Sequence, residues 1–166
     1  MVGRGERRTR WCLVILPLVA ALGFAAQSSA AVDLTTVYSQ SIVKAVFARH
    51  YDTVWNFIDP AYRKDVNKTR WEHCVGNLVS QSQTYRLKSI EVSGTRRLQS
   101  DLPVLGRVVL IDVSLQVLYS LPGSHTLQAG ILYAYWVKEK GKWNAVWLPS
   151  QLSAYKAGKC SPASLY

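Results

Sequence analysis

The sequence predicts an α+β domain in which three N-terminal helices pack against an antiparallel sheet. Two observations predict this class. Apolar residues first recur every three or four positions, and after Ser82 they alternate with polar ones instead. Helical periodicity followed by a series of strands is the α+β layout. With 166 residues, 49% of them hydrophobic, the chain is suited to one domain of ordinary size.

Residues 1–30 have the layout of a secretory signal peptide. A head with four Arg precedes an apolar run over 11–26, and Ser28 and Ala30 are small residues suited to cleavage before Ala31. A retained membrane anchor is the alternative, but the run is shorter than the ~20 residues of a spanning helix. We therefore expect a signal peptide over 1–30, a domain over 31–149, a C-terminal tail over 150–166, and a secreted or envelope location.

Three helices are expected before Ser82. The first covers 33–49. The second is short, is capped by Asp52 and is ended by Asp59-Pro60, because a residue before proline avoids the α region. Thr69 and Glu72 fit a capping box at the start of a third helix over 70–80.

The strands begin near Tyr85, with a slip in the alternation near Ser89 that suggests a bulge. The stretch 99–106 is expected to be a loop. The next strand presents a row of apolar residues from Val109 to Tyr119 to the helices, and odd-numbered residues over 127–137 are expected to line the core from the strand after it. A charged hairpin over 138–142 leads to the last strand, over 143–147, which Pro149 ends.

The charge favours a solvated surface rather than a nucleic-acid interface. Residues 31–166 keep 16 Lys and Arg against 9 Asp and Glu, a net charge of +7, and the basic residues are scattered. We expect no nucleic-acid partner, and weak association with anionic components of the cell envelope.

Cys74 and Cys160 remain after cleavage of the leader, and an even pair in an oxidising compartment predicts a disulfide. Neither C-x-x-C nor H-E-x-x-H spacing occurs, so the sequence indicates no metal site, and we expect no cofactor.

The order of elements and three local signatures resemble the nuclear transport factor 2-like superfamily, which includes ketosteroid isomerases and SnoaL-like cyclases. The signatures are residues 49–63, the helix 69–77 and the hairpin 140–143 leading into the last strand. The resemblance covers 33–148. It implies a cone-shaped fold, with a curved sheet wrapped around a helix and an apolar pocket that holds a small molecule or is filled.

The catalytic residues that the resemblance implies are poorly represented. Such isomerases use a tyrosine and buried acids, for which Tyr38 and Asp112 are the candidates, and His73 is a candidate acid/base. Asp112 shares its face of the strand with polar residues, so we expect it on the outer sheet face, where Asp112→Ala costs at most about 1 kcal/mol. Asp59 is better explained as a turn or capping residue, and a lone helical His is more often structural.

We therefore expect an exported, non-catalytic protein that binds a small apolar ligand through a pocket near Tyr38, Trp55 and Trp71, or binds another envelope component. The alternative is a pocket isomerase, cyclase or dehydratase that uses His73 or Asp112 with a tyrosine. A further hypothesis is a homodimer through an apolar patch on the outer sheet face, formed by Val108, Leu110, Leu118, Leu132 and Trp136.

Overall fold

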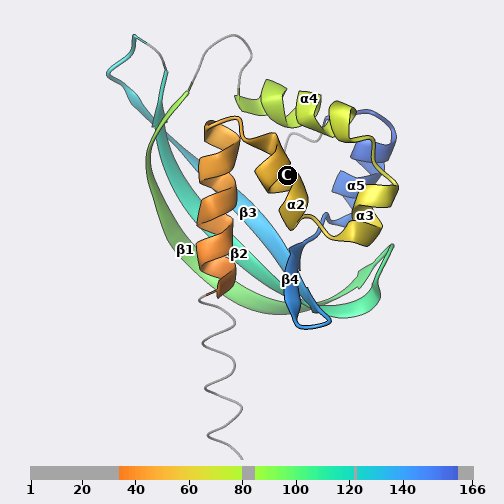
Figure 1. The fold of residues 1–166 in the computed structure, drawn as a ribbon. Helices are drawn as coiled ribbons and strands as arrows, with labels where there is room; N and C mark the ends of the chain where they lie inside the picture. The colour runs from red at the N-terminus through yellow and green to blue at the C-terminus, as the bar shows by residue number, and fades with distance from the viewer. Residues whose placement is uncertain (1–33, 80–84, 122, 161–166) are drawn as a thin grey trace, which may run out of the picture.

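The computed structural model describes residues 34–79, 85–121 and 123–160, so the signal peptide expected over 1–30 lies outside the described residues. Helices precede a four-stranded antiparallel sheet, which confirms the α+β class (Figure 1). An unlabelled helix over 34–47 comes first. The labelled elements are α2 (Tyr51–Phe57), α3 (Pro60–Lys64), α4 (Lys68–Val79), β1 (Arg86–Leu102), β2 (Gly106–Ser120), β3 (Leu127–Glu139), β4 (Lys142–Ala145) and α5 (Pro149–Lys156).

The short helix α3 was not expected. α2 begins at Tyr51 after His50, so Asp52 lies in its first turn and is not the cap that the sequence predicts. α2 ends at Phe57, as the proline rule predicts, but Pro60 then occupies the first turn of a new helix. The Asp59 carboxylate caps this helix by accepting a hydrogen bond from the backbone N–H of Ala61 at 2.8 Å. A proline lacks a backbone N–H, but at the first helical position this N–H would have no partner within the helix. The described chain thus has four helices before the sheet, and the capping role expected for Asp59 is confirmed.

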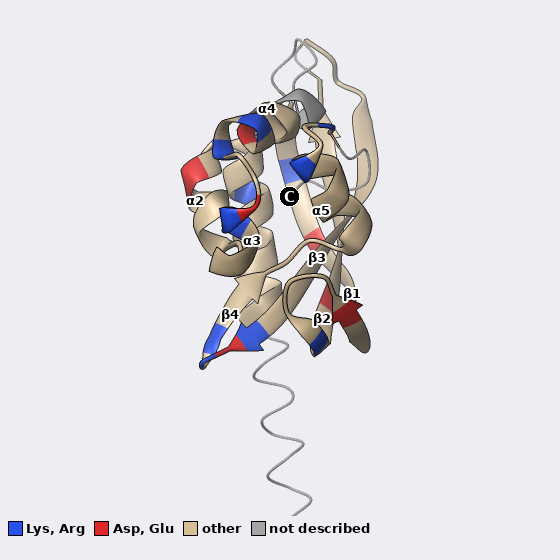
Figure 2. Cartoon of the chain, turned by 90° about the vertical axis from the view of Figure 1, so that its right-hand side faces the viewer, with Lys and Arg blue, Asp and Glu red and all other residues tan. Residues whose placement is uncertain are grey.

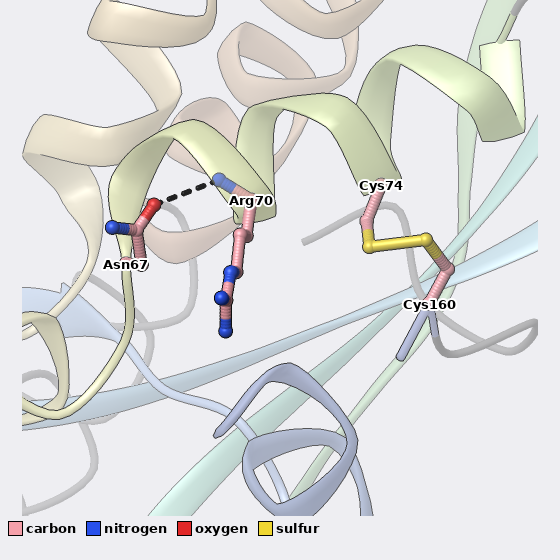
Figure 3. The surroundings of a disulfide bond; sticks show 4 residues. All are labelled: Asn67, Arg70, Cys74 and Cys160. Atoms are coloured by element: carbon pink, nitrogen blue, oxygen red, sulfur yellow. Dashed lines mark hydrogen bonds between the residues drawn. A yellow bond between two sulfur atoms is a disulfide. The ribbon is translucent and has the colours of Figure 1, made fainter. Parts of the chain in front are cut away.

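The start of α4 also differs from the expectation. The helix begins at Lys68, and the Asn67 side chain accepts from the backbone N–H of Arg70 at 3.0 Å (Figure 3). Asn67 is therefore the N-cap, and Thr69 lies inside the helix. Asn and Thr are both good N-caps, so the capping-box pattern selected the wrong one of two nearby candidates.

The sheet has the order β1-β2-β3-β4, with each strand antiparallel to the next. In Figure 1, β1 and β2 bend along their length and curve around the helix over 34–47. A register shift between Leu87 and Ser89 confirms the bulge expected there. The loop expected over 99–106 is shorter, because β1 continues to Leu102.

One hydrogen bond fixes which face of the sheet meets the helices. Trp136 Nε1 in β3 donates to Ser39 Oγ, which lies on the helix over 34–47, at 2.8 Å. Trp136 is paired with Ile111, so this face also carries Ile111, Val113 and the alternate buried residues of β2 that follow. The expected helix-facing row of β2 is confirmed over 111–117, whereas Val109 is 53% exposed.

The faces expected for β3 were inverted. Trp136 is fully buried and Leu132 shares its face, while Ile131 on the opposite face is 61% exposed. β3 has apolar residues on both faces, so alternation alone cannot orient it. The expected residues therefore do not form an apolar patch on the outer face, because Trp136 and Leu132 face the helices and Leu110 is buried.

The first part of the expected C-terminal tail is a helix, α5. Pro149 is in its first turn, and Gln151 Oε1 accepts from the backbone N–H of Leu148 at 2.8 Å. Gly158, with φ of 69°, follows the helix, and the N–H of Lys159 returns to the carbonyl of Ala154. Proline at the start and glycine after the end are the ordinary signals of a helix.

The expected disulfide is present. Cys74 in α4 and Cys160 beyond α5 are bonded, with their Cα atoms 5.0 Å apart (Figure 3). The bond fastens the chain after α5 to α4. The side chain of Arg70 also crosses towards this segment, since a Cβ on Gly158 would lie 3.5 Å from its guanidinium.

Candidate functional site

The three residues expected to form one ligand pocket belong to two separate ring clusters. Tyr38 packs against Phe57 and Trp136, with ring centroids 5.4 and 5.7 Å apart. Trp55 packs instead against Trp71 at 5.1 Å and Trp147 at 6.3 Å. The structure thus brings Trp55 and Trp71 together, and their neighbours are other aromatic rings.

The second cluster belongs to the core. Trp71 and Trp147 are fully buried, and Trp147 also contacts Tyr62 and Tyr155. The indole nitrogens of Trp71 and Trp147 and the Tyr62 hydroxyl form no hydrogen bond to a described residue. Burial raises the pKa of Tyr62 to about 12, and the nearby Asp59 carboxylate adds to the shift. Tyr62 therefore remains protonated through the neutral range.

The candidate catalytic residues lie apart. His73 is exposed on α4. Tyr38 packs against Trp136 on the helix-facing side of the sheet, whereas Asp112 follows Ile111 and points to the opposite face. The structure does not assemble His73, Asp112 and Tyr38 into one site.

Asp112 differs from its expected setting. It points away from the helix-facing row, as predicted, but it is 0% exposed rather than solvated. Arg96 on β1 donates from Nε to Oδ2 at 2.6 Å, and Oδ1 has no hydrogen-bond partner among the described residues. Tyr135 is opposite Asp112 in the β2–β3 ladder, and its pKa is raised by burial and, to a smaller extent, by the Asp112 charge. Tyr135 is thus a protonated phenol beside an ionic pair.

A cleft opens where the sheet divides. The β2–β3 ladder runs from Ser120–Leu127 to Ile111–Trp136 and stops there. Beyond that point β2 stays paired with β1 as far as Gly106, and β3 stays paired with β4 as far as Glu139. The two hairpins therefore diverge, and residues 106–110 of β2 are not paired with residues 137–139 of β3.

The cleft between these hairpins has a volume of about 440 Å³. Ile111 and Val137, both nearly buried, contribute to its lining, together with the more exposed Val109 and the Trp143 ring. Its remaining lining residues are Val108, Arg97, Lys138 and Glu139. The cleft is thus mainly apolar, with charged groups from β1 and β3.

The charged residues of the cleft are mainly cationic. Lys138 Nζ lies 5.8 Å from the centre of the Trp143 ring, and the guanidinium of Arg97 is exposed. Burial raises the pKa of Glu139, and the Asp59 carboxylate raises it further. The negative charge of Glu139 therefore offsets the two cations less as the pH falls. Such a surface can bind an apolar group that carries a negative charge at one end.

Sequence reasoning missed this cleft because its cause is not local. The only sequence signal is the pair Val108-Val109, which makes both faces of β2 apolar at that end. Alternation predicts strands but does not say where two neighbouring strands stop pairing.

Within the described residues, no group of three or more His, Cys, Asp or Glu side chains is placed to hold a metal ion. Over the same residues, no helix is both long enough and apolar enough to cross a bilayer. No protein-family model matches the chain, and no curated protein is significantly similar to it.

Proposed function

We propose that this chain is an exported, non-catalytic binding domain that holds a small apolar molecule with an anionic end in the cleft between the β1–β2 and β3–β4 hairpins. The observation that carries the proposal is the cleft itself, with its apolar lining and two cations. Its volume of about 440 Å³ lies in the range of small-molecule sites, which span roughly 300–1,000 Å³.

Arg97 and Lys138 give the ligand its chemical class. Both side chains are exposed and line the cleft, so each stays hydrated without a ligand and can pair with a carboxylate when one is present. The apolar part of the ligand covers Val109, Val137 and the Trp143 ring. Removing these surfaces from water contributes roughly 25 cal/mol per Å² of apolar area.

The proposal keeps the resemblance to the nuclear transport factor 2-like superfamily and its cone-shaped fold. It is supported by helices that precede a four-stranded antiparallel sheet, and by strands that curve around the first of those helices (Figure 1). It moves the ligand from the rings near Tyr38, Trp55 and Trp71 to the division of the sheet. The disulfide and the leader-like residues 1–30 support export, because disulfides persist mainly in oxidising compartments.

Calorimetric titration of the purified protein with decanoate and with decanol tests the proposal. We expect decanoate to bind more tightly than decanol. Arg97→Gln with Lys138→Gln should remove that preference while leaving decanol binding in place, because only the charge contact is lost. Binding of both ligands at equal strength by the wild type would contradict the anionic class.

A matched pair of neutral substitutions tests the location. Val109→Gln removes apolar surface from the cleft, whereas Ile131→Gln changes a similarly exposed β-branched residue outside it. We expect Val109→Gln to weaken decanoate about five-fold, since losing about 1 kcal/mol of apolar contact has that effect. Ile131→Gln should leave the affinity unchanged. Equal affinities for the two variants would place the ligand elsewhere.

A further inference from the structure

A second group of polar side chains lies at the other end of β2 and β3, remote from the cleft. Arg86 and Lys88 come from the start of β1, and Ser120 is the last residue of β2. Ser124 and His125 come from the segment that connects β2 to β3. These five residues line a pair of adjoining depressions with volumes of about 350 and 290 Å³, which share all of them except Arg86.

Strand pairing explains why these residues converge. Ser120 is paired with Arg86 on one side and with Leu127 on the other, so the three lie in a row across the sheet. The bulge near Ser89 shifts the register beside Lys88, which also lines both depressions. Strand pairing therefore fixes the positions of Arg86 and Ser120 relative to each other.

Two serines contribute hydroxyl groups to the depressions. Ser120 is only 4% exposed and lines both depressions, and its Oγ is not one of the fully enclosed side-chain atoms that lack a partner among the described residues. A hydroxyl that lines a depression can donate a hydrogen bond to an anion bound there. Ser124 Oγ accepts from the backbone N–H of Thr126 at 3.1 Å, which leaves its own proton available to donate.

The charge at this site has a single sign. No Asp or Glu is among the residues that line the two depressions, and Arg86 and Lys88 enter none of the ion pairs formed by described residues. On the helices, by contrast, basic side chains form ion pairs: Lys68 pairs with Asp52, and Lys156 pairs with Asp65 at 2.7 Å. Figure 2 shows basic and acidic segments side by side there.

We infer that this group is a binding site for a phosphoryl group. Arg86 and Lys88 supply the positive charge, and Ser120, Ser124 and His125 supply further hydrogen-bond donors. A tetrahedral oxyanion presents several oxygens in different directions, which suits a guanidinium, an ammonium and hydroxyls arranged around it. Leu127, which is exposed beside Ser120, gives an apolar contact for the organic part of a phosphate ester. The inference is independent of the cleft and of the proposed function.

The test uses the full-length protein, inorganic phosphate followed by ³¹P NMR, and vesicles of phosphatidylglycerol or phosphatidylcholine followed by co-sedimentation. We expect phosphate binding, with Arg86→Gln/Lys88→Gln weakening it at least ten-fold. The control Lys140→Gln/Lys142→Gln removes the same charge from the exposed β3–β4 hairpin and should bind as the wild type does. Equal weakening by both double variants would mean general electrostatic attraction and would overturn the site.

A competition experiment identifies the source of the phosphoryl group, and a second variant keeps the test valid if the first does not fold. If inorganic phosphate competes with phosphatidylglycerol vesicles, the site takes a lipid headgroup; if the vesicles do not bind but phosphate does, it takes a soluble phosphate. Ser120→Ala keeps every charge and should weaken phosphate binding several-fold, even if the Arg86→Gln/Lys88→Gln protein does not fold. Absence of phosphate binding by the wild type, or wild-type affinity in Ser120→Ala, would overturn the inference.

Discussion

Arg96 and Asp112 form an ionic pair of unequal exposure across β1 and β2. The Arg96 side chain is 66% exposed, while the Asp112 side chain to which it donates is 0% exposed. The guanidinium thus neutralises a buried carboxylate from the solvent side. Asp112 therefore has a structural role, which differs from the expectation that it lies on the solvated surface of the sheet.

Asp112→Ala should therefore destabilise the protein measurably. We expect a loss of about 1–3 kcal/mol, because a hydrogen bond between charged groups is removed from a buried position. Gln116→Ala, on the same face of β2 but exposed, should stay within about 0.5 kcal/mol. Urea denaturation measures both. A loss as small as that of Gln116→Ala would restore the expectation that Asp112 behaves as a surface residue.

Arg96→Ala should cost more stability than Asp112→Ala. It leaves the Asp112 carboxylate buried without a partner, whereas Asp112→Ala leaves only an exposed cation. The same denaturation experiment ranks the two variants. The reverse order would show that water reaches the carboxylate once the guanidinium is removed.

Trp136→Phe should weaken the attachment of the sheet to the first described helix. The variant loses the hydrogen bond to Ser39 Oγ, and we expect a loss of about 1–3 kcal/mol. Trp143→Phe, at a half-exposed ring in the cleft, is the matched control for stability and should cost less. Equal losses would mean that the two indoles are equally buried in solution.

The disulfide should make a large contribution to stability. Cys74 and Cys160 are separated by 86 positions, and for such a loop the chain-entropy model gives about 4–5 kcal/mol. Reduction, or the double substitution to Ser, should lower the melting temperature. A reductant should have no further effect on the double variant, and free thiols at both positions in the native protein would contradict the pairing.

Tyr62 should contribute a loss of stability at high pH. Its pKa is raised to about 12 from an ordinary value of 10, so the unfolded chain gives up the phenolic proton first. This contribution is complete below pH 10 and is lost as the pH rises towards 12. Tyr62→Phe should flatten that part of the stability profile, measured by denaturation between pH 9 and 12. An unchanged slope would show that the phenol titrates normally.

Periodicity and chemistry predicted the fold class and the elements with clear local signals. The bulge near Ser89, the helix-facing row of β2 over 111–117 and the Cys74–Cys160 bond are local or pairwise features, and the structure confirms each. α5 does not follow from the sequence pattern although Pro149 and Gly158 mark its ends, because a proline can end a strand as well as begin a helix.

The remaining features depend on tertiary packing. β3 has apolar residues on both faces, so only the contact of Trp136 with the helix over 34–47 decides its orientation. The cleft arises because the β2–β3 ladder ends at Ile111, and the residues at that point do not indicate in the sequence that pairing ends there. The rings of Tyr38, Trp55 and Trp71 suggested a pocket by composition, whereas the structure packs them against other rings.

The most direct test of the account is an NMR titration of the protein with decanoate that measures contacts between the ligand and the indole groups. We predict intermolecular nuclear Overhauser effects from the ligand methylenes to the Trp143 ring and to the Val109 methyls, with the Trp71 and Trp147 signals unshifted. Contacts to Trp55 or Trp71 in place of Trp143 would contradict the cleft and return the ligand to the aromatic cluster. No contacts at saturating decanoate would contradict the proposed function.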